Sequence, residues 1–170
     1  MIIRKAEIKD ARAIAKISVD TWKDAYKGLI DDAILEGRKV DDKRISSWCE
    51  NIQNLDFTVL VCEYNEVLGY LWAGPARDEY GLKHEIYALY VKTSAQRKGV
   101  GTELIKAYKK IIKDESFYLY MIKNNKKASS FYETSGGCVW ERYNRKIQDR
   151  NHTIEEICYV FKWEKSWVKK

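Results

Sequence analysis

The sequence predicts an α/β fold in which helices flank a mixed sheet. Three observations predict it: apolar residues at helical spacing, short runs rich in β-branched and aromatic residues, and the alternation of the two along the chain. The expected order is a strand, two helical regions, three strands, a helix, a strand, a short helix and two strands. A chain of 170 residues without an internal linker or repeat is expected to form one domain over residues 1–170.

The first third of the chain predicts a strand and two helical regions. Residues 2–5 form the strand, and Asp10 is placed to cap the helix that follows. Apolar residues at helical spacing continue from 11 to 26, and Gly28 ends the run. A second helical region is expected over residues 34–51. A cover over a site and plain helix packing both agree with this pattern.

The middle of the chain predicts three strands, over residues 57–64, 67–73 and 84–91. The first is apolar on both faces and is therefore expected to be central. A polar loop over residues 74–83 precedes the third strand. In that third strand, period-two alternation places four residues on one face. They are Glu85, Tyr87, Leu89 and Val91.

The last part predicts an amphipathic helix, a strand, a short helix and a final pair of strands. The short helix ends at Gly136-Gly137. The ranges are 100–113, 117–122, 128–135, 139–147 and 156–163.

Charge, cysteine and histidine content limit the kinds of ligand that the protein is expected to bind. Thirty-one basic and 25 acidic side chains give a formal net charge of +6, which suits an anionic ligand such as a phosphorylated cofactor or a nucleic acid. The four cysteines form no C-x-x-C pair and the two histidines are isolated, so no metal is expected. No signal peptide or membrane span is visible, and a cytoplasmic protein with reduced thiols is expected.

The polar segment before the amphipathic helix has the features of a phosphate cradle. A helix N-terminus leaves backbone N–H groups unpaired and carries positive potential. Gly99 and Gly101 lack side chains that would keep an anion away, and Arg97 and Lys98 add charge. The segment matches neither the dinucleotide G-x-G-x-x-G fingerprint nor a Walker loop. An ordinary glycine-containing helix start is the alternative.

A second motif favours the phosphate cradle over the ordinary helix start. The pattern N-x-x-A-x-x-F-Y-x-x-x-G follows the strand 117–122, and the segment before the helix fits [QR]-x-x-G-x-[GA]. With the strand 85–91, these motifs resemble the GNAT acetyltransferase superfamily over essentially the whole chain. One departure is Gly137-Cys138, where the family usually has a bulky apolar residue after the motif glycine. The motif residues are Gln96, Gly99 and Gly101, and then Asn125, Ala128, Phe131, Tyr132 and Gly136.

The resemblance implies a GNAT-like fold with a mostly antiparallel central sheet flanked by helices. It implies acetyl-CoA as co-substrate and transfer of the acetyl group to a primary amine. The strand before the cradle would be bulged, part from its neighbour and pair its backbone with the amide-bearing arm of CoA. The implied cofactor-binding residues are Leu89, Tyr90, Val91, Gln96, Arg97, Lys98, Gly99, Val100, Gly101, Thr102, Asn125 and Ala128.

Direct transfer needs a group that takes a proton from the amine and one that gives a proton to the thiolate. Glu85 is the candidate base, and a salt-bridged glutamate is the alternative. Tyr132 is the candidate acid, and a buried packing tyrosine is the alternative. Candidate residues lining the acceptor site, each also open to a role as a core aromatic, are Trp22, Tyr26, Trp72 and Tyr87.

The sequence does not identify the acetyl acceptor, since a small-molecule amine and a peptide amine both fit. Neither a nucleic acid nor a membrane is expected as partner, and a homodimer is compatible with the sequence. A CoA-binding regulatory module that keeps the cradle but lacks turnover is the alternative function.

Overall fold

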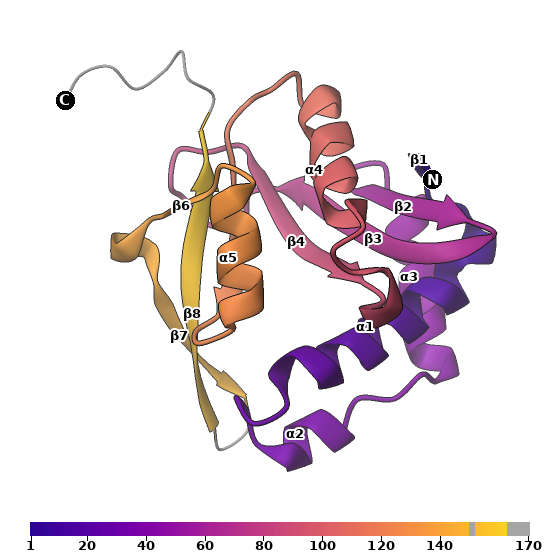
Figure 1. Cartoon of the computed structure of the whole chain (residues 1–170), viewed down its shortest axis with the longest axis horizontal. Coiled ribbons are helices and arrows are strands. Elements are labelled where there is room, and N and C mark those ends of the chain that lie inside the picture. Colours follow the sequence, from indigo (N-terminus) through magenta and orange to yellow (C-terminus); the bar gives the residue numbers. More distant parts are fainter. Residues whose placement is uncertain (150–151, 163–170) are drawn as a thin grey trace.

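The computed structural model describes residues 1–149 and 152–162, and its strands form a single sheet (Figure 1). The strand order is β1-β2-β3-β4-β5-β8-β6, and β7 also pairs with β8. Among the described strands only β4 and β5 run parallel, which confirms a mixed, mostly antiparallel sheet. The strands are β1 (Ile2–Lys5), β2 (Thr58–Tyr64), β3 (Glu66–Pro75), β4 (His84–Val91), β5 (Phe117–Ile122), β6 (Cys138–Val139), β7 (Arg145–Asp149) and β8 (His152–Phe161).

Helices pack on both faces of the sheet. One core joins α4 and α5 to the sheet, with Leu104 and Tyr132 among its buried residues. A second core joins α1 and α3 to the other face, with Ile14 and Trp48 at its centre. The α-helices are α1 (Ala11–Tyr26), α2 (Asp32–Glu36), α3 (Asp42–Gln53), α4 (Val100–Ile111) and α5 (Lys126–Thr134). Short 3-10 turns cover Ile8–Asp10, Thr93–Ala95 and Glu141–Tyr143.

A third, smaller core joins the end of α1 and the helix α2 to the ends of β5 and β8. Trp22 and Tyr26 contribute from α1, and Ile122 and Ile154 from the two strands. In Figure 1, α1 and α2 accordingly lie below the gap that separates β4 from α5 and β8. This core holds the two halves of the sheet together where β4 and β5 do not.

The helical region expected over residues 34–51 proved to be two helices, α2 and α3, so that prediction is wrong. Gly37 ends α2 and donates its N–H to Ala33 O. Asp41 then begins α3 by accepting the Arg44 N–H at 2.8 Å. The connection between them places Arg38 and its neighbours outside any helix.

The strand expected over residues 139–147 is also interrupted. β6 covers only two residues, a 3-10 turn follows, and β7 begins at Arg145. Trp140 donates its N–H to Cys158 O, and the Asn144 side chain accepts the Cys158 N–H, so both ends of the interruption are tied to β8. β8 itself begins at His152, earlier than expected, and Trp163 lies outside the described residues.

Asp10 precedes α1 as expected, but its carboxylate does not cap that helix. It accepts two hydrogen bonds from Arg4 at 2.7 and 3.0 Å and one from the Glu7 N–H at 2.8 Å. The net effect is a lowered pKa for this carboxyl. Burial acts to raise the pKa, but the hydrogen bonds from Arg4 and Glu7 lower it by more. Asp10 therefore ties β1 to the start of α1.

The structure explains the departure at Gly137. A Cβ there would lie 2.8 Å from Cζ of Phe161, closer than real contacts allow. The Phe161 ring stacks on Phe117, with ring centroids 4.6 Å apart. Phe161 thus takes the space beside α5 that a bulky residue after Gly136 would need.

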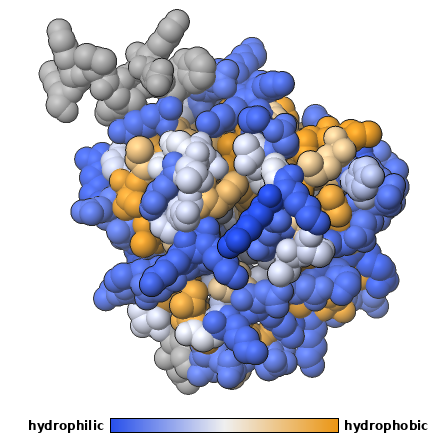
Figure 2. Space-filling model, in the orientation of Figure 1, coloured by the Kyte–Doolittle hydropathy of each residue, from blue (hydrophilic) through white to orange (hydrophobic). Residues whose placement is uncertain are grey.

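No helix within residues 1–149 and 152–162 combines the length and the apolar character that a membrane span requires. On the face seen in Figure 2, apolar side chains appear as small groups among polar ones.

Gly137→Ala should lower the free energy of unfolding by about 1–3 kcal/mol, because the added methyl group overpacks the Phe161 ring. Urea unfolding measures the change. The matched test repeats Gly137→Ala in a Phe161→Leu background, where the ring is absent and the added cost should shrink. Equal costs in both backgrounds would contradict the contact.

Candidate active site

The central feature of the candidate site is the divergence of β4 from β5. The two strands pair only over His84–Ile86 and Phe117–Leu119. The register between β3 and β4 shifts so that β4 holds one extra residue, Tyr87, which is a β-bulge. Among the described strands, Leu89–Val91 then pair with β3 alone, so the other backbone edge of this segment faces the gap.

The bulge also reverses the alternation of side chains along β4. Leu89 and Val91 pack on the core beneath α4. Tyr87 instead packs on Trp72, which belongs to the core on the α1 side. Glu85 points away from the α4 core, since its neighbour Ile86 lies within that core. The prediction that one face carries these residues together is therefore wrong, because a bulge shifts the period by one.

The N-terminus of α4 borders the same gap. Gly99 precedes the helix in the left-handed conformation, with φ of 82°. The first bond back to this glycine comes from the Glu103 N–H, at 3.0 Å, so the N–H groups of Val100–Thr102 have no partner in the helix. The exposed side chains of Arg97 and Lys98 lie just before the helix. This end of α4 has the donors and the positive potential that an anion needs.

The structure gives Gly101 a packing role that sequence reasoning missed. A Cβ on Gly101 would lie 2.9 Å from Cζ of Phe131, so the glycine admits the Phe131 ring. Nothing lies within 4 Å of the Cβ position on Gly99, where the positive φ is the constraint. The two motifs, far apart in sequence, therefore touch where α4 begins.

Tyr132 on α5 belongs to a group of phenols from three elements. Its ring lies 5.6 Å from that of Tyr159, and only 8% of the residue is exposed. Burial raises the pKa of its phenol, and the nearby Tyr90 and Tyr159 raise it further. Burial likewise raises the pKa of Tyr26 well above the usual value, with Tyr90 and Tyr132 adding to it. Tyr26 of α1, Tyr90 of β4 and Tyr132 of α5 thus come together at the gap as protonated phenols.

Asn125 occupies the N-cap of α5. Its side-chain oxygen accepts the Ala128 N–H at 3.2 Å. The amide NH₂ of Asn125 makes no hydrogen bond to another residue in the described part of the chain. The cap therefore fixes the side chain and leaves its donors available.

Glu85 is fully buried and its carboxylate is strongly hydrogen-bonded. Arg77 donates to it from the backbone N–H at 3.1 Å, from Nε at 3.0 Å and from a terminal guanidinium nitrogen. The Tyr118 hydroxyl donates a further bond at 3.0 Å. The Arg77 guanidinium also lies 4.4 Å from the centroid of Tyr87. This geometry favours the salt-bridged glutamate over the general base.

The four predicted lining residues fall into two separate aromatic groups. Trp22 and Tyr26 contact each other edge to face at 5.3 Å, beside the gap. Trp72 and Tyr87 contact each other at 4.9 Å and pack with Phe57. Trp22 and Tyr26 therefore lie beside Tyr90, whereas Trp72 and Tyr87 lie beside the Arg77–Glu85 pair.

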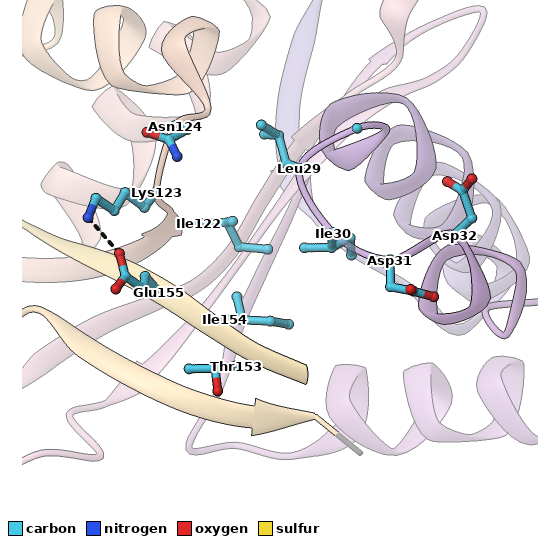
Figure 3. A pocket seen from close by; sticks show the side chains of 11 residues that line it. Leu29, Ile30, Asp31, Asp32, Ile122, Lys123, Asn124, Thr153, Ile154 and Glu155 are labelled. Atoms are coloured by element: carbon cyan, nitrogen blue, oxygen red, sulfur yellow. Dashed lines mark hydrogen bonds and ion pairs between the residues drawn. The ribbon is translucent and has the colours of Figure 1, made fainter. Parts of the chain in front are cut away.

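A pocket of about 710 Å³ lies between the α1–α2 connection and the ends of β5 and β8 (Figure 3). Leu29 and Ile30 point into it from one side, and Ile122 and Ile154 from the other. Lys123 and Glu155 form an ion pair at its edge. None of the predicted lining residues borders this pocket, because its walls come from three distant segments that share no sequence pattern. Its full lining is Gly28, Leu29, Ile30, Asp31, Asp32, Ile122, Lys123, Asn124, Thr153, Ile154 and Glu155.

Comparison with known proteins agrees with this geometry. The family model described as the acetyltransferase (GNAT) family matches residues 19–136. An uncharacterized N-acetyltransferase of Bacillus subtilis (strain 168), YuaI, is 28% identical over 130 residues, which cover 72% of each chain.

Solved structures show the same fold. The PaiA N-acetyltransferase of Thermoplasma acidophilum, in complex with coenzyme A, aligns with a TM-score of 0.75 at 22% identity, over 95% of this chain and 98% of that one. The Salmonella typhimurium putative acetyltransferase YncA, with acetyl-CoA, aligns with a TM-score of 0.70 at 19% identity, over 100% and 98%. With the family match and the diverging strands, these findings show that the chain belongs to the GNAT acetyltransferase family and is an N-acetyltransferase that draws its acetyl group from acetyl-CoA.

Proposed function

We propose that this protein transfers the acetyl group directly from acetyl-CoA to a primary amine of a small molecule or a peptide. The observation that carries the proposal is the gap between β4 and β5, where an unpaired strand edge, a helix N-terminus and a group of protonated phenols meet. A thioester in this gap would lie between donors for its phosphates and an acid for its sulfur.

The residues of the gap suit the parts of acetyl-CoA. The free edge of Leu89–Val91 can pair with the amides of the CoA arm as an added strand would. The N–H groups at the start of α4, with Arg97 and Lys98, suit the pyrophosphate. The Asn125 amide can donate to the cofactor arm, and Ala128 next to it is small enough for close approach.

Gln96 has a supporting part in this arrangement. Its side-chain amide donates to Val91 O at 3.2 Å, so it ties the loop before α4 to the end of β4. We assign Gln96 to holding the phosphate-binding loop against the strand that would bind the CoA arm. The phosphate-binding loop and the strand edge for the CoA arm would then stay fixed relative to each other.

The reaction joins the amine nitrogen to the acetyl carbonyl carbon and breaks the carbon–sulfur bond. The amine must be neutral when it attacks, and it loses one further proton as the amide forms. The departing thiolate takes one proton, which we assign to the Tyr132 hydroxyl. The proton that the amine releases then restores the phenol, directly or through water. A phenol with a raised pKa stays protonated at neutral pH, so Tyr132 serves as an acid and not as a base.

The pocket beside α2 is the proposed entry for the acceptor. It lies next to the core that includes Trp22, Tyr26 and Tyr90, since Ile122 and Ile154 belong to both. Its lining mixes apolar side chains such as Ile30 and Ile122 with polar ones such as Asp32 and Thr153. The amine would approach the thioester from α1 while α5 supplies the acid.

Release of free thiol from acetyl-CoA with a panel of amines tests the proposed function, and mass spectrometry identifies the acceptor by its gain of one acetyl group. Turnover with an amine and a matching acetylated product are expected. Tight CoA binding without turnover across the panel would instead favour the regulatory module.

Tyr132→Phe should lower kcat by about 10²–10⁴-fold, since it removes the acid and keeps the ring. The affinity for CoA, measured by calorimetry, should stay near that of the parent. Because burial raises the pKa of this phenol above about 10, the parent should show no fall in kcat from Tyr132 below about pH 10. Undiminished turnover under conditions where chemistry limits the rate would rule out this role.

Glu85→Gln should lower the free energy of unfolding by about 1–3 kcal/mol, because it weakens the bonds to Arg77. Its pH–rate profile should keep the shape of the parent profile and only scale down. Arg77→Met is the matched control, since it breaks the same pair and leaves the carboxylate. A loss of activity chiefly at acidic pH in Glu85→Gln, with no such loss in Arg77→Met, would contradict the structural role and identify Glu85 as the base.

A further inference from the structure

Arg38 is a partly buried cation without a paired carboxylate among residues 1–149 and 152–162. It lies in the connection between α2 and α3, and its guanidinium carbon is 3.9 Å from the centroid of the Trp22 ring. Burial lowers the pKa of the guanidinium. No carboxylate of the described residues lies within the 4.0 Å of an ion pair from it.

Other partly buried arginines of this chain each form an ion pair with a carboxylate. Arg4 pairs with Asp10, Arg77 with Glu85, and Arg145 with Glu156. Arg38 has no such pair, and the charge of Arg44 on α3 adds to the burial that lowers its pKa. Its stacking on Trp22 offsets only part of the cost of burial. A buried cation in this state favours the arrival of an anion.

Three acids close to Arg38 along the chain have partners elsewhere, and one of them, Asp41, accepts the Arg44 N–H at the start of α3. Glu36, two residues before it, lies 3.7 Å from the Lys23 ammonium and is strongly exposed. Asp31 accepts the Ala33 N–H at the start of α2. Within the described residues, therefore, no acid forms an ion pair with the Arg38 guanidinium.

Arg38 lies beside the phenols that border the gap. Its charge acts on Tyr90 and Tyr26, and with Arg44 it opposes the effect of burial on the pKa of Tyr70. The Tyr70 hydroxyl is buried and has no hydrogen-bond partner of normal geometry among the described residues. Since Tyr90 is on the diverging part of β4, the cation is on the α1 side of the reacting centre.

We propose that Arg38 binds a carboxylate of the acceptor, so that the substrates are amines that also carry a carboxyl group. The proposal rests on the function proposed above and adds the substrate class. A guanidinium held over an indole ring can still offer its N–H donors to a ligand, and their fork geometry matches the two oxygens of a carboxylate. The phenols of Tyr26 and Tyr90 would then line the path between the carboxylate and the amine.

The test uses free amino acids and short peptides, each compared with its own carboxyl-terminal amide. Calorimetry on the CoA-saturated protein measures binding without turnover, and thiol release from acetyl-CoA measures kcat/KM. For at least one acid, affinity and kcat/KM should exceed those of its amide by about tenfold to a hundredfold, the usual range for a charged hydrogen bond.

Arg38→Met should reduce that ratio to about one and leave the amide almost unchanged. Arg38→Lys keeps the charge, loses the planar edge and should keep part of the ratio, which also covers a failure of the methionine variant to fold. Arg12→Met is the control, because Arg12 is an exposed arginine on α1. CoA affinity should be the same in all four proteins.

Equal treatment of every acid and its amide, or a ratio that survives in both Arg38 variants, would overturn the proposal. Amide acetylation without any preference for acids would leave the proposed function standing and remove only this inference. If calorimetry showed an Arg38-dependent preference for acids but no amine were acetylated, the carboxylate site would stand and the proposed function would be removed. Preference for O-phosphoethanolamine over ethanolamine, with none for carboxylates, would overturn the carboxylate assignment.

Discussion

The structure depends on one constraint, the separation of two neighbouring strands after three residue pairs. β4 and β5 pair only as far as Ile86 and Leu119, and the bulge at Tyr87 then turns β4 away. An unpaired strand edge inside a sheet is costly, because backbone N–H and C=O groups need partners. Two other features make it tolerable: the core of α1, α2, β5 and β8 joins the two halves of the sheet, and the free edge is available to a ligand with amides of its own.

The same separation sets the electrostatics of the site. Elements from both faces reach into the gap, so Tyr26, Tyr90 and Tyr132 meet in a region poor in water. Burial there disfavours the charged form of each phenol, and each neighbour that could ionise disfavours it further. A group of this kind keeps its protons at neutral pH, which suits donation to a departing thiolate. The donors at the start of α4 favour anions nearby, so the proposed acid and the proposed anion site border the same gap.

Two arginines show how this fold uses a cation in different ways. Arg77 comes from the β3–β4 loop and satisfies the buried Glu85, so it fixes that loop over β4 and makes the carboxylate part of the framework. The Arg38 guanidinium lies over Trp22 and pairs with no carboxylate of the described residues, and we propose that it binds the acceptor. The difference lies in whether the chain supplies the counter-charge. A paired cation holds parts of the fold together, whereas a cation without a counter-charge is available to a ligand, as we propose for Arg38.

The sequence alone determined the fold class, most of the elements and the two motifs, because period, turn residues and glycine positions are local properties. It thus located the α4 cradle and the short helix with Tyr132, and it explained Gly99 by its place at a helix start. Tertiary structure decided the rest. Five features depend on which distant segments meet. They are the bulge at Tyr87, the ring of Phe131 against Gly101, the ion pair of Glu85, the pocket beside α2 and the position of Arg38 over Trp22. Such contacts leave no period in the sequence, because each is fixed by packing across the sheet and not by the residues beside it.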